Sequence, residues 1–343
     1  MRATIILPAV PVACRAAVLA ALYPVLLLGL TAQQVLWPVR SGPLALGEVF
    51  APYLFVPLLV LVPLAVWRGM GGLRILLAVC VGVFLLRFPP HLGSAPPLAT
   101  SAAPQFTALA WNVRLGGEWA QIRPVLATTP AGIVALEESD GQGLHGDLQL
   151  ARRYPTVLVQ RAQGADGLTL LSQYPLRDHG TLRGPADPVP RAIWAQLDIG
   201  TAQPLLVVVV HPVPPLTFAG KHPWQAAYDP TIRDATLATI RGFVAPALRR
   251  GQPVLVLGDC NLTEREPAYT DLTQGLQDAD RLAGGDLGLT WRPKPLIRQP
   301  LALLRIDYLF SSPTLVPLQV STDCTPRGSD HCAVTGRFAL RAT

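Results

Sequence analysis

Short apolar runs that alternate with turn signals fill the sequence from residue 106 onward. Runs of this kind, bounded by Gly, Pro, Asn or Asp, are typical of β-strands, whereas amphipathic helices repeat their apolar positions every three to four residues. We expect strands at 106–111, 132–136, 156–160, 168–171, 192–197, 205–210, 254–257 and 306–310, and helices at 119–128 and 230–249. Many strands with few helices predict layered sheets flanked by helices in one domain.

A polar side chain of a chemically useful kind follows or interrupts many of these runs. An Asn or Asp in such a place often only caps a turn, so each residue alone has a structural explanation. Strand ends gather along the edge of a sheet, however, and together the polar residues predict one site. They are Asn112, Glu137, Glu138, His211, Asp259, Asn261, Asp307, Asp330 and His331.

The residue types in this set indicate the chemistry. Carboxylates with an amide and no thiolate suit a hard cation that prefers oxygen ligands, Mg²⁺ or else Mn²⁺. Two histidines beside several acids add proton transfer and hydrogen bonds to phosphate. The set therefore predicts cleavage of a phosphate ester, in which a metal and hydrogen-bond donors stabilise the charge on the phosphoryl oxygens.

The order of the motifs carries a family resemblance. WNV, ALEES, LLSQYPL, VVVVHP, LGDCN, LTW, RIDYLF and GSDH follow one another between residues 106 and 338. In this order they resemble the endonuclease/exonuclease/phosphatase superfamily, which includes deoxyribonucleases, abasic-site endonucleases, neutral sphingomyelinases and inositol-polyphosphate phosphatases. The resemblance implies an α/β fold, a four-layer α/β sandwich of two packed mixed sheets flanked by helices. The apolar N-terminal part is similar to the membrane-anchored bacterial branch of the family.

The resemblance also implies roles for single residues. Asn112 and Glu138 match the first metal ligands of the family, and Asp330 matches an acid near the metal. Glu137 falls where the family often has Gln, so Glu138 is the expected ligand of the pair.

The remaining roles concern the phosphate and the attacking water. His211 and Asn261 match groups that hold the scissile phosphate. Asp259 matches the acid that orients or deprotonates water, and Asp307 matches the partner that fixes the tautomer and orientation of His331.

The run VLVLGDCN, residues 254–261, shows how one strand can deliver two of these groups. Gly258 lets the chain turn tightly as it leaves a buried strand. Side chains alternate between the two faces of a strand, so Asp259 and Asn261 are expected to share a face while Cys260 points away.

The sequence departs from the family in two places. HPVPP replaces the usual surroundings of the first histidine, and residues 216–234 form an insertion with prolines and aromatic residues. Substrate contacts by Lys221, His222, Trp224 and Arg233 are one interpretation of the insertion. A surface loop packed by Trp224 is the other.

Two long apolar stretches without charge, 16–39 and 49–67, and a shorter one at 75–86 precede this domain. A transmembrane helix needs about 20 residues, so the pattern predicts a membrane anchor of about three helices at 1–88. The third stretch has a second interpretation as a buried or interfacial helix. A proline- and alanine-rich linker is expected at 89–104 and the catalytic domain at 105–343.

The arginines predict the orientation of the anchor. Arg2 and Arg15 precede the first stretch, and Arg68 and Arg74 lie between the second and the third. Positively charged loops stay in the cytoplasm. We therefore expect a multi-pass protein of the cell membrane with an extracytoplasmic catalytic domain, and with the lipid bilayer as a partner of the N-terminal helices.

The distribution of charge bears on the substrate. Residues 1–103 hold six arginines and one acid, so most of the net charge of +6 belongs to the apolar segment. The rest holds 22 basic and 21 acidic side chains, with only two lysines. Tight binding of duplex DNA needs several cations opposite phosphates. A small or membrane-associated phosphoester is therefore favoured, and a nuclease that acts on extracytoplasmic DNA is the alternative.

Other classes of function fit less well. A non-catalytic, membrane-tethered binding module of the same fold is expected to have lost some of the acids and histidines, and all are present. A transporter is excluded because three helices are few and the polar residues lie outside them. No obligate protein partner is inferred. The cysteine spacing does not suggest zinc, and a bridge between Cys324 and Cys332 stays open.

Overall fold

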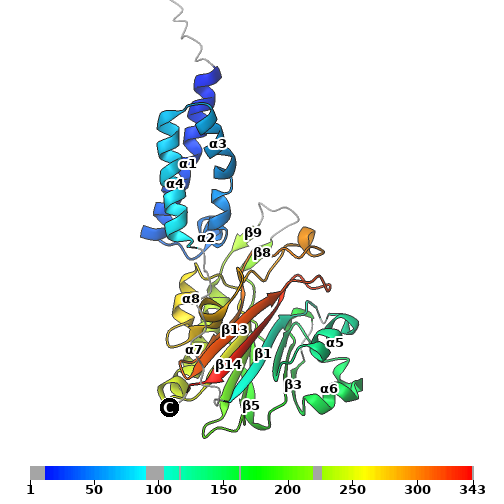
Figure 1. Cartoon of the computed structure of the whole chain (residues 1–343). Helices are drawn as coiled ribbons and strands as arrows, with labels where there is room; N and C mark the ends of the chain where they lie inside the picture. Colours follow the sequence, from blue (N-terminus) through cyan, green and yellow to red (C-terminus); the bar gives the residue numbers. More distant parts are fainter. Residues whose placement is uncertain (1–11, 90–103, 116, 162–163, 219–225, 342–343) are drawn as a thin grey trace, which may run out of the picture. The chain divides into compact units, whose positions relative to one another are not determined.

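The computed structural model describes residues 12–89, 104–115, 117–161, 164–218 and 226–341 (Figure 1). The chain divides into two compact units, unit 1 at 1–90 and unit 2 at 91–343. Most of the predicted linker lies outside the described residues, as do the candidate contacts Lys221, His222 and Trp224.

Unit 1 is helical. Its elements are α1 (Val12–Leu36), α2 (Gly42–Val49), the 3₁₀ helix η1 (Ala51–Phe55), α3 (Leu58–Trp67) and α4 (Gly71–Arg87). Within its described residues, no single helix is both long enough and apolar enough to cross a membrane. One pair of helical segments, Gly42–Val49 with Ala51–Trp67, meets both conditions together but is bent by 80°. The expected three spans therefore stay a prediction.

Unit 2 contains two mixed six-stranded sheets. The first has the order β13-β14-β1-β2-β4-β3 and the second β11-β12-β10-β7-β6-β5. Each has one parallel pair near its centre, β1 with β2 and β7 with β10. The strands are β1 (Gln105–Asn112), β2 (Ile133–Glu137), β3 (Thr156–Gln160), β4 (Leu168–Ser172), β5 (Leu176–Leu182), β6 (Ala192–Leu197), β7 (Leu205–Val210), β10 (Val254–Asp259), β11 (Gln277–Asp278), β12 (Asp307–Ser311), β13 (Leu315–Asp323) and β14 (Ala333–Leu340); a separate hairpin pairs β8 (Leu216–Phe218) with β9 (Ala226–Tyr228).

Alternation of side chains along the strands builds the core. Ala110, Ala135 and Leu170 of the first sheet face Val209 and Leu257 of the second in one buried cluster. The outer face of the first sheet packs against α5 (Trp119–Thr128) and α6 (Leu148–Arg153).

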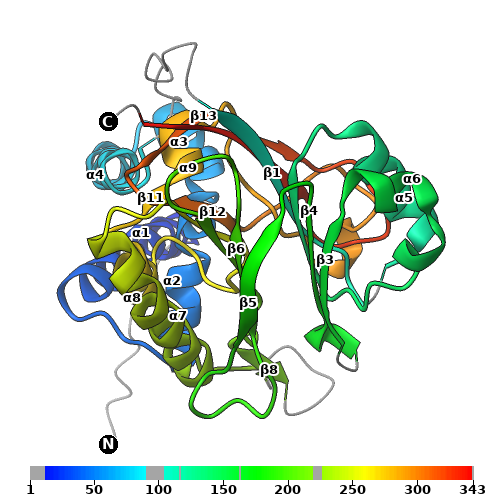
Figure 2. The same cartoon turned by 90° about the horizontal axis from the view of Figure 1, so that it is seen from below.

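The second sheet is covered in the same way. Its outer face packs against α7 (Thr231–Arg249) and α8 (Pro267–Leu272). Figure 2 shows the two helix pairs on opposite sides of the strands. The prediction of two mixed sheets between helical layers is confirmed.

Three long strands, β5, β13 and β14, were not predicted. β5 (Leu176–Leu182) is an edge strand whose residues are mostly exposed, so it lacks an apolar run. β13 (Leu315–Asp323) contains Pro317, which usually argues against a strand. Here β13 is also an edge strand, and its pairing with β14 (Ala333–Leu340) shifts register beside that proline.

Candidate active site

The strand register brings the predicted residues to one edge of the sandwich. Asn112 lies opposite Glu137 where β1 and β2 end, and Asp259 lies opposite Asp307 where β10 ends and β12 begins. His211 directly follows β7, the parallel neighbour of β10. Polar groups from both sheets therefore meet between the strand ends.

An amide stands between two carboxylates at this edge. The side-chain nitrogen of Asn112 donates to Oε1 of Glu138 at 3.1 Å and to Oδ2 of Asp259 at 3.0 Å. Glu138 has a positive φ of 55°, and its second oxygen accepts the backbone N–H of Leu115 at 2.7 Å. The loops after β1 and β2 thus hold Glu138 and Asn112 in contact.

A second group couples a histidine to two acids. Nδ1 of His331 lies 3.0 Å from Oδ2 of Asp307, and its Nε2 lies 3.7 Å from Oδ2 of Asp259. Burial alone would lower the pKa of His331, but the charges of Asp307 and Asp259 outweigh it and raise the pKa to about 10. His331 is therefore a cation at neutral pH, and its Nδ1–H donates to Asp307.

Asp259 connects the two groups. Burial raises its pKa to about 7; the charge of Asp307 adds to this rise, and the charge of His331 opposes it. Its Oδ1 accepts the backbone N–H of Asn261 at 2.9 Å. A carboxyl with a pKa close to neutral is suited to accept a proton from water.

His211 is neutral in this setting. Its Nε2 lies 3.5 Å from Oδ2 of Asp259 and 3.9 Å from Oε1 of Glu138. Burial, with the charges of His331 and Arg191, lowers its pKa to about 4. A neutral imidazole can still donate one hydrogen bond to a phosphoryl oxygen.

Position 258 requires glycine for the tight turn expected from the sequence and also because neighbouring atoms leave no room for a Cβ. Its φ is +130°, and a Cβ at this position would overlap the carbonyl oxygen of Val210 and lie 2.7 Å from Oε1 of Glu137. Only glycine lets the end of β10 approach β7 and Glu137 so closely.

Glu137 is buried without a partner. Its side chain is fully enclosed, and neither carboxyl oxygen has a hydrogen bond within the described part of the chain. Burial, together with the charges of Asp307 and Asp259, raises its pKa well above the usual range. The site therefore carries more acid than its described bases neutralise.

The side chains of Asp330 and Asn261 contact groups outside the cluster formed by Asn112, Glu138, Asp259 and His331. Oδ1 of Asp330 lies 3.6 Å from Nε of Arg114, so its role beside the metal stays a prediction. The amide nitrogen of Asn261 donates to the carbonyl oxygen of Pro212 at 3.0 Å, and its φ of 50° ends the strand alternation expected between Asp259 and Asn261.

Arg292 is a supporting residue that the sequence did not reveal. It is fully buried; its backbone N–H donates to the carbonyl oxygen of Asp330 at 2.9 Å, and its guanidinium to that of His331 at 3.2 Å. The same guanidinium donates to the carbonyl oxygen of Cys324, which forms a disulfide with Cys332. The hydrogen bonds from Arg292 and the disulfide at Cys332 thus both fix the segment that carries His331.

Arg233 corrects one interpretation of the insertion. Its side chain is 1% exposed, and its guanidinium donates to the carbonyl oxygen of Asn261 at 2.8 Å and pairs with Glu266 at 2.6 Å. A buried guanidinium with these partners does not reach a substrate. Arg233 instead holds the loop that follows Asp259.

The donor set fits a divalent cation. The carboxylates of Asp259 and Asp307, and a ring nitrogen of His331 once this residue has lost its proton, offer ligand atoms within 4.8 Å of one another, and Asn112 and Glu138 lie beside them. The donors are mainly oxygens, and the surplus of buried acid, including the unpartnered Glu137, favours a positive charge.

Comparison with known proteins agrees with this geometry. The sequence of residues 109–331 matches the profile of the Endonuclease/Exonuclease/phosphatase family. The chain belongs to this family. Its members are phosphoester hydrolases, and this chain is an enzyme of that class. Among the curated proteins, none matches the sequence.

Solved structures share the fold. The 3′ phosphatase NExo from Neisseria, bound to a product DNA hairpin, has a TM-score of 0.54 at 20% identity and covers 69% of this chain and 100% of its own. Truncated TDP2 from Caenorhabditis elegans has a TM-score of 0.54 at 18% identity, covering 69% and 98%. A mannosyl-6-phosphatase from Bacteroides thetaiotaomicron has a TM-score of 0.52 at 16% identity, covering 68% and 100%. These likenesses concern the fold alone.

Proposed function

We propose that this family member is a divalent-metal-dependent phosphoesterase that cleaves its substrate by attack of water. The observation that carries the proposal is Asp259, which lies between the amide of Asn112 at 3.0 Å and the ring of His331 at 3.7 Å. Asp259 takes a proton from water as the water oxygen bonds to phosphorus and the bond to the leaving oxygen breaks. His331, held by Asp307, stabilises the negative charge that develops.

Other residues bind the phosphate and a metal. His211 and Asn261 donate hydrogen bonds to the phosphoryl oxygens, after Asn261 exchanges its bond to Pro212. Asn112 and Glu138, with Asp330 nearby, would hold Mg²⁺ or Mn²⁺, which supplies positive charge for the phosphoryl oxygens and lowers the pKa of a bound water.

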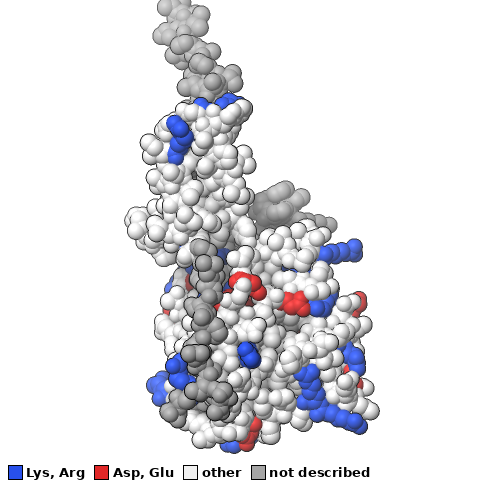
Figure 3. Space-filling model, viewed as in Figure 1, with Lys and Arg blue, Asp and Glu red and all other residues white. Residues whose placement is uncertain are grey.

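A small or membrane-associated phosphoester is the proposed substrate class. The charged residues of unit 2 are nearly balanced, and Figure 3 shows basic and acidic side chains scattered over the visible face of this unit. The visible face does not show the row of cations that duplex DNA requires.

The test is a substrate panel with the full-length protein. Plasmid DNA, lysophospholipid, sphingomyelin and inositol phosphate are incubated with Mg²⁺ or Mn²⁺, and again with excess chelator. We expect metal-dependent release of product, fastest for a lipid or small phosphoester. Faster hydrolysis of plasmid at physiological salt would favour the nuclease alternative, and full hydrolysis in chelator would contradict the metal mechanism.

We further propose that unit 1 anchors the protein in a membrane. Large apolar side chains on its helices are exposed, among them Leu59 at 76%, Trp67 at 76% and Leu86 at 86%. Apolar side chains in such number favour contact with lipid or protein. The arginine distribution favours an extracytoplasmic unit 2, and the disulfide between Cys324 and Cys332 is typical of an oxidising compartment.

The topology has its own test. A reporter that works only in the cytoplasm is fused after Thr343, and a periplasmic reporter is fused at the same residue in a parallel strain. We expect activity from the second alone. Activity of the cytoplasmic reporter would reverse the orientation or change the number of spans.

A further inference from the structure

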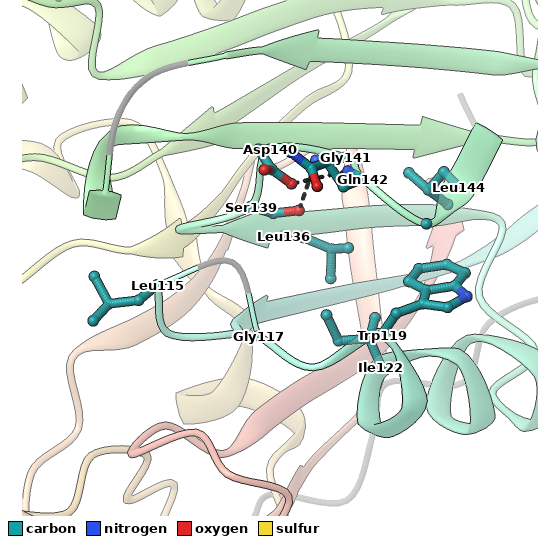
Figure 4. A pocket seen from close by; sticks show the side chains of 11 residues that line it. Leu115, Gly117, Trp119, Ile122, Leu136, Ser139, Asp140, Gly141, Gln142 and Leu144 are labelled. Atoms are coloured by element: carbon teal, nitrogen blue, oxygen red, sulfur yellow. Dashed lines mark hydrogen bonds between the residues drawn. The ribbon is translucent and has the colours of Figure 1, made fainter. Parts of the chain in front are cut away.

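A pocket of about 410 Å³ lies beside the active site, between α5 and the loop that follows β2. Figure 4 shows Trp119, Ile122 and Leu136 together below the segment that carries Ser139, Asp140 and Gln142. The volume lies within the range of small-molecule sites in proteins, about 300–1,000 Å³. None of the roles assigned so far uses this pocket.

The pocket is connected to the predicted metal ligand through the backbone. Ser139, in its wall, directly follows Glu138 in the sequence. Leu115, on the opposite loop, also lines the pocket, and its backbone N–H is the group that donates to Glu138 at 2.7 Å. A substrate whose phosphate lies at Glu138 therefore has this pocket as a neighbouring space.

Close packing shapes the wall of the pocket. Gly143 has a φ of +82°, and a Cβ there would lie 2.6 Å from Cδ2 of Trp119. Only glycine lets the loop contact the indole so closely. Asp140 fixes the same loop by accepting the backbone N–H of Gln142 at 2.9 Å. The walls thus keep their shape, which lowers the entropy cost of binding.

The lining selects the kind of ligand. Trp119, Ile122, Leu136 and Leu144 supply an apolar surface, whereas Asp140 and Gln142 supply hydrogen-bonding groups. Among the described residues that line the pocket, Asp140 is the one charged side chain and none is Lys or Arg. A second phosphate is therefore disfavoured, and an uncharged ring with an apolar face and hydroxyl or N–H groups fits best.

We propose that this pocket binds the organic group of the substrate, an uncharged polar ring attached to the phosphate, and so sets the specificity of the enzyme. The proposal rests on the proposed phosphoesterase function. A nucleoside and a hexose share the required chemistry, and the experiment separates them.

The experiment compares substrates that share a phosphate but differ in the attached group. Methyl, thymidine-5′ and glucose-6 groups are each offered as the phosphomonoester and as the p-nitrophenyl diester, to the full-length protein with Mg²⁺ or Mn²⁺. Wild type is compared with Trp119→Ala and Gln142→Ala; the second changes an exposed side chain and keeps the test valid if the first variant does not fold. Asp178→Asn, on an exposed part of β5, is the control.

We expect wild type to prefer one ring-bearing ester over the methyl ester in kcat/KM. Each pocket variant should reduce this preference at least about tenfold, mainly through KM, as for the loss of a specificity contact. The control should keep the preference. Preference for thymidine identifies a nucleoside site, and preference for glucose a sugar site.

Two outcomes overturn the proposal. In one, wild type shows no preference for either ring over methyl; in the other, the folded pocket variants keep the wild-type preference. Failure of the proposed function gives a different result, because wild type would then release no product from any ester in the presence of metal.

Discussion

Two clusters of charged residues in unit 2, each with buried members, differ in their balance of acids and bases. The arginine cluster contains three acids and three bases, Glu264, Asp278, Asp280, Arg265, Arg281 and Arg305. The site cluster contains four acids and two histidines, Glu137, Glu138, Asp259, Asp307, His211 and His331, of which His211 is neutral. Arg305 and Asp307 are two residues apart, so one short segment contributes to both clusters.

The pKa values of the acids differ between the two clusters. In the arginine cluster Glu264 accepts from Arg305 at 3.0 Å and also pairs with Arg281; the arginines outweigh its burial and lower its pKa. In the site cluster burial raises the pKa of Glu137 and Asp259. Asp280 resembles the site acids, because its Oδ1 lacks a described partner and burial raises its pKa. The comparison teaches that arginines offset the burial of Glu264 in the first cluster, whereas in the site the charges present leave the pKa values of Glu137 and Asp259 raised.

The largest expected effect belongs to the arginine cluster. Arg305→Met should lower the free energy of unfolding by about 3–5 kcal/mol, because Glu264, Asp278 and Asp280 lose a buried partner. Chemical denaturation of the full-length protein measures the change. Arg177→Met, which removes an exposed pair with Asp198, is the control and should cost at most about 1 kcal/mol. Equal losses for the two variants would contradict the structural role.

The next effect concerns turnover. His331→Ala or Asp259→Ala should each lower kcat at least about a hundredfold, the scale of a positioned acid–base group, equal to about 2.7 kcal/mol. Neither change should unfold the protein, since both residues lie at strand ends. Steady-state kinetics and circular dichroism check the two statements. Folded variants with nearly full activity would show that the site is elsewhere.

A smaller effect concerns stability and pH. The pKa of Asp259 is raised from an ordinary 3.8 to about 7, so between these values the folded state binds the extra proton and wild type loses stability as pH rises. Without metal, Asp259→Asn should therefore be more stable than wild type at pH 8 by about 1–2 kcal/mol, or roughly 5 °C in Tm.

The gain in stability of Asp259→Asn over wild type should shrink towards pH 4, where Asp259 of wild type is protonated. His211, whose lowered pKa has the opposite effect on stability, is present in both proteins and cancels in the difference. Thermal denaturation from pH 4 to 8 in chelator measures the trend. A gain that grows as pH falls would refute it.

The smallest effect tests the support of His331. The planar guanidinium of Arg292 donates to the carbonyl oxygens of Gln299, Cys324 and His331 from a rigid fork. The compact ammonium of Lys, on a flexible stem, does not reproduce this geometry, so Arg292→Lys should lower kcat about threefold to tenfold and change KM little. The ring resonances of His331 should shift in NMR spectra. Unchanged resonances with unchanged kcat would restrict Arg292 to a structural role.

Regular periodicity made much of the fold predictable. The helix expected at 119–128 coincides with α5, which buries Ile122, Val125 and Leu126 at helical spacing. The strand expected at 205–210 coincides with β7, which is a continuous buried apolar run. The convergence of polar residues followed from the rule that strand ends share an edge. Edge strands such as β5 were not predicted, because their exposed residues do not form an apolar pattern.

The supporting residues were not predictable in the same way. Arginine is usually exposed, so nothing local distinguishes the buried Arg292 or Arg233 from the other arginines. Their roles depend on carbonyl groups at Cys324, His331 and Asn261, which only the tertiary structure brings near. The bridge between Cys324 and Cys332 likewise depends on how β13 pairs with β14.

The pairing of β1 with β14 has a consequence for the folding of the chain during its synthesis. Gln105 pairs with Ala339, so β1, which has β2 on its other side, finds its second neighbour only after more than two hundred further residues have been synthesised. Until then one side of β1 is an open sheet edge, which is prone to pair with other chains. His331 arrives with the same late segment. A nascent chain therefore acquires the strand that covers this side of β1 together with His331 of the candidate site, and every unfinished chain keeps an exposed sheet edge.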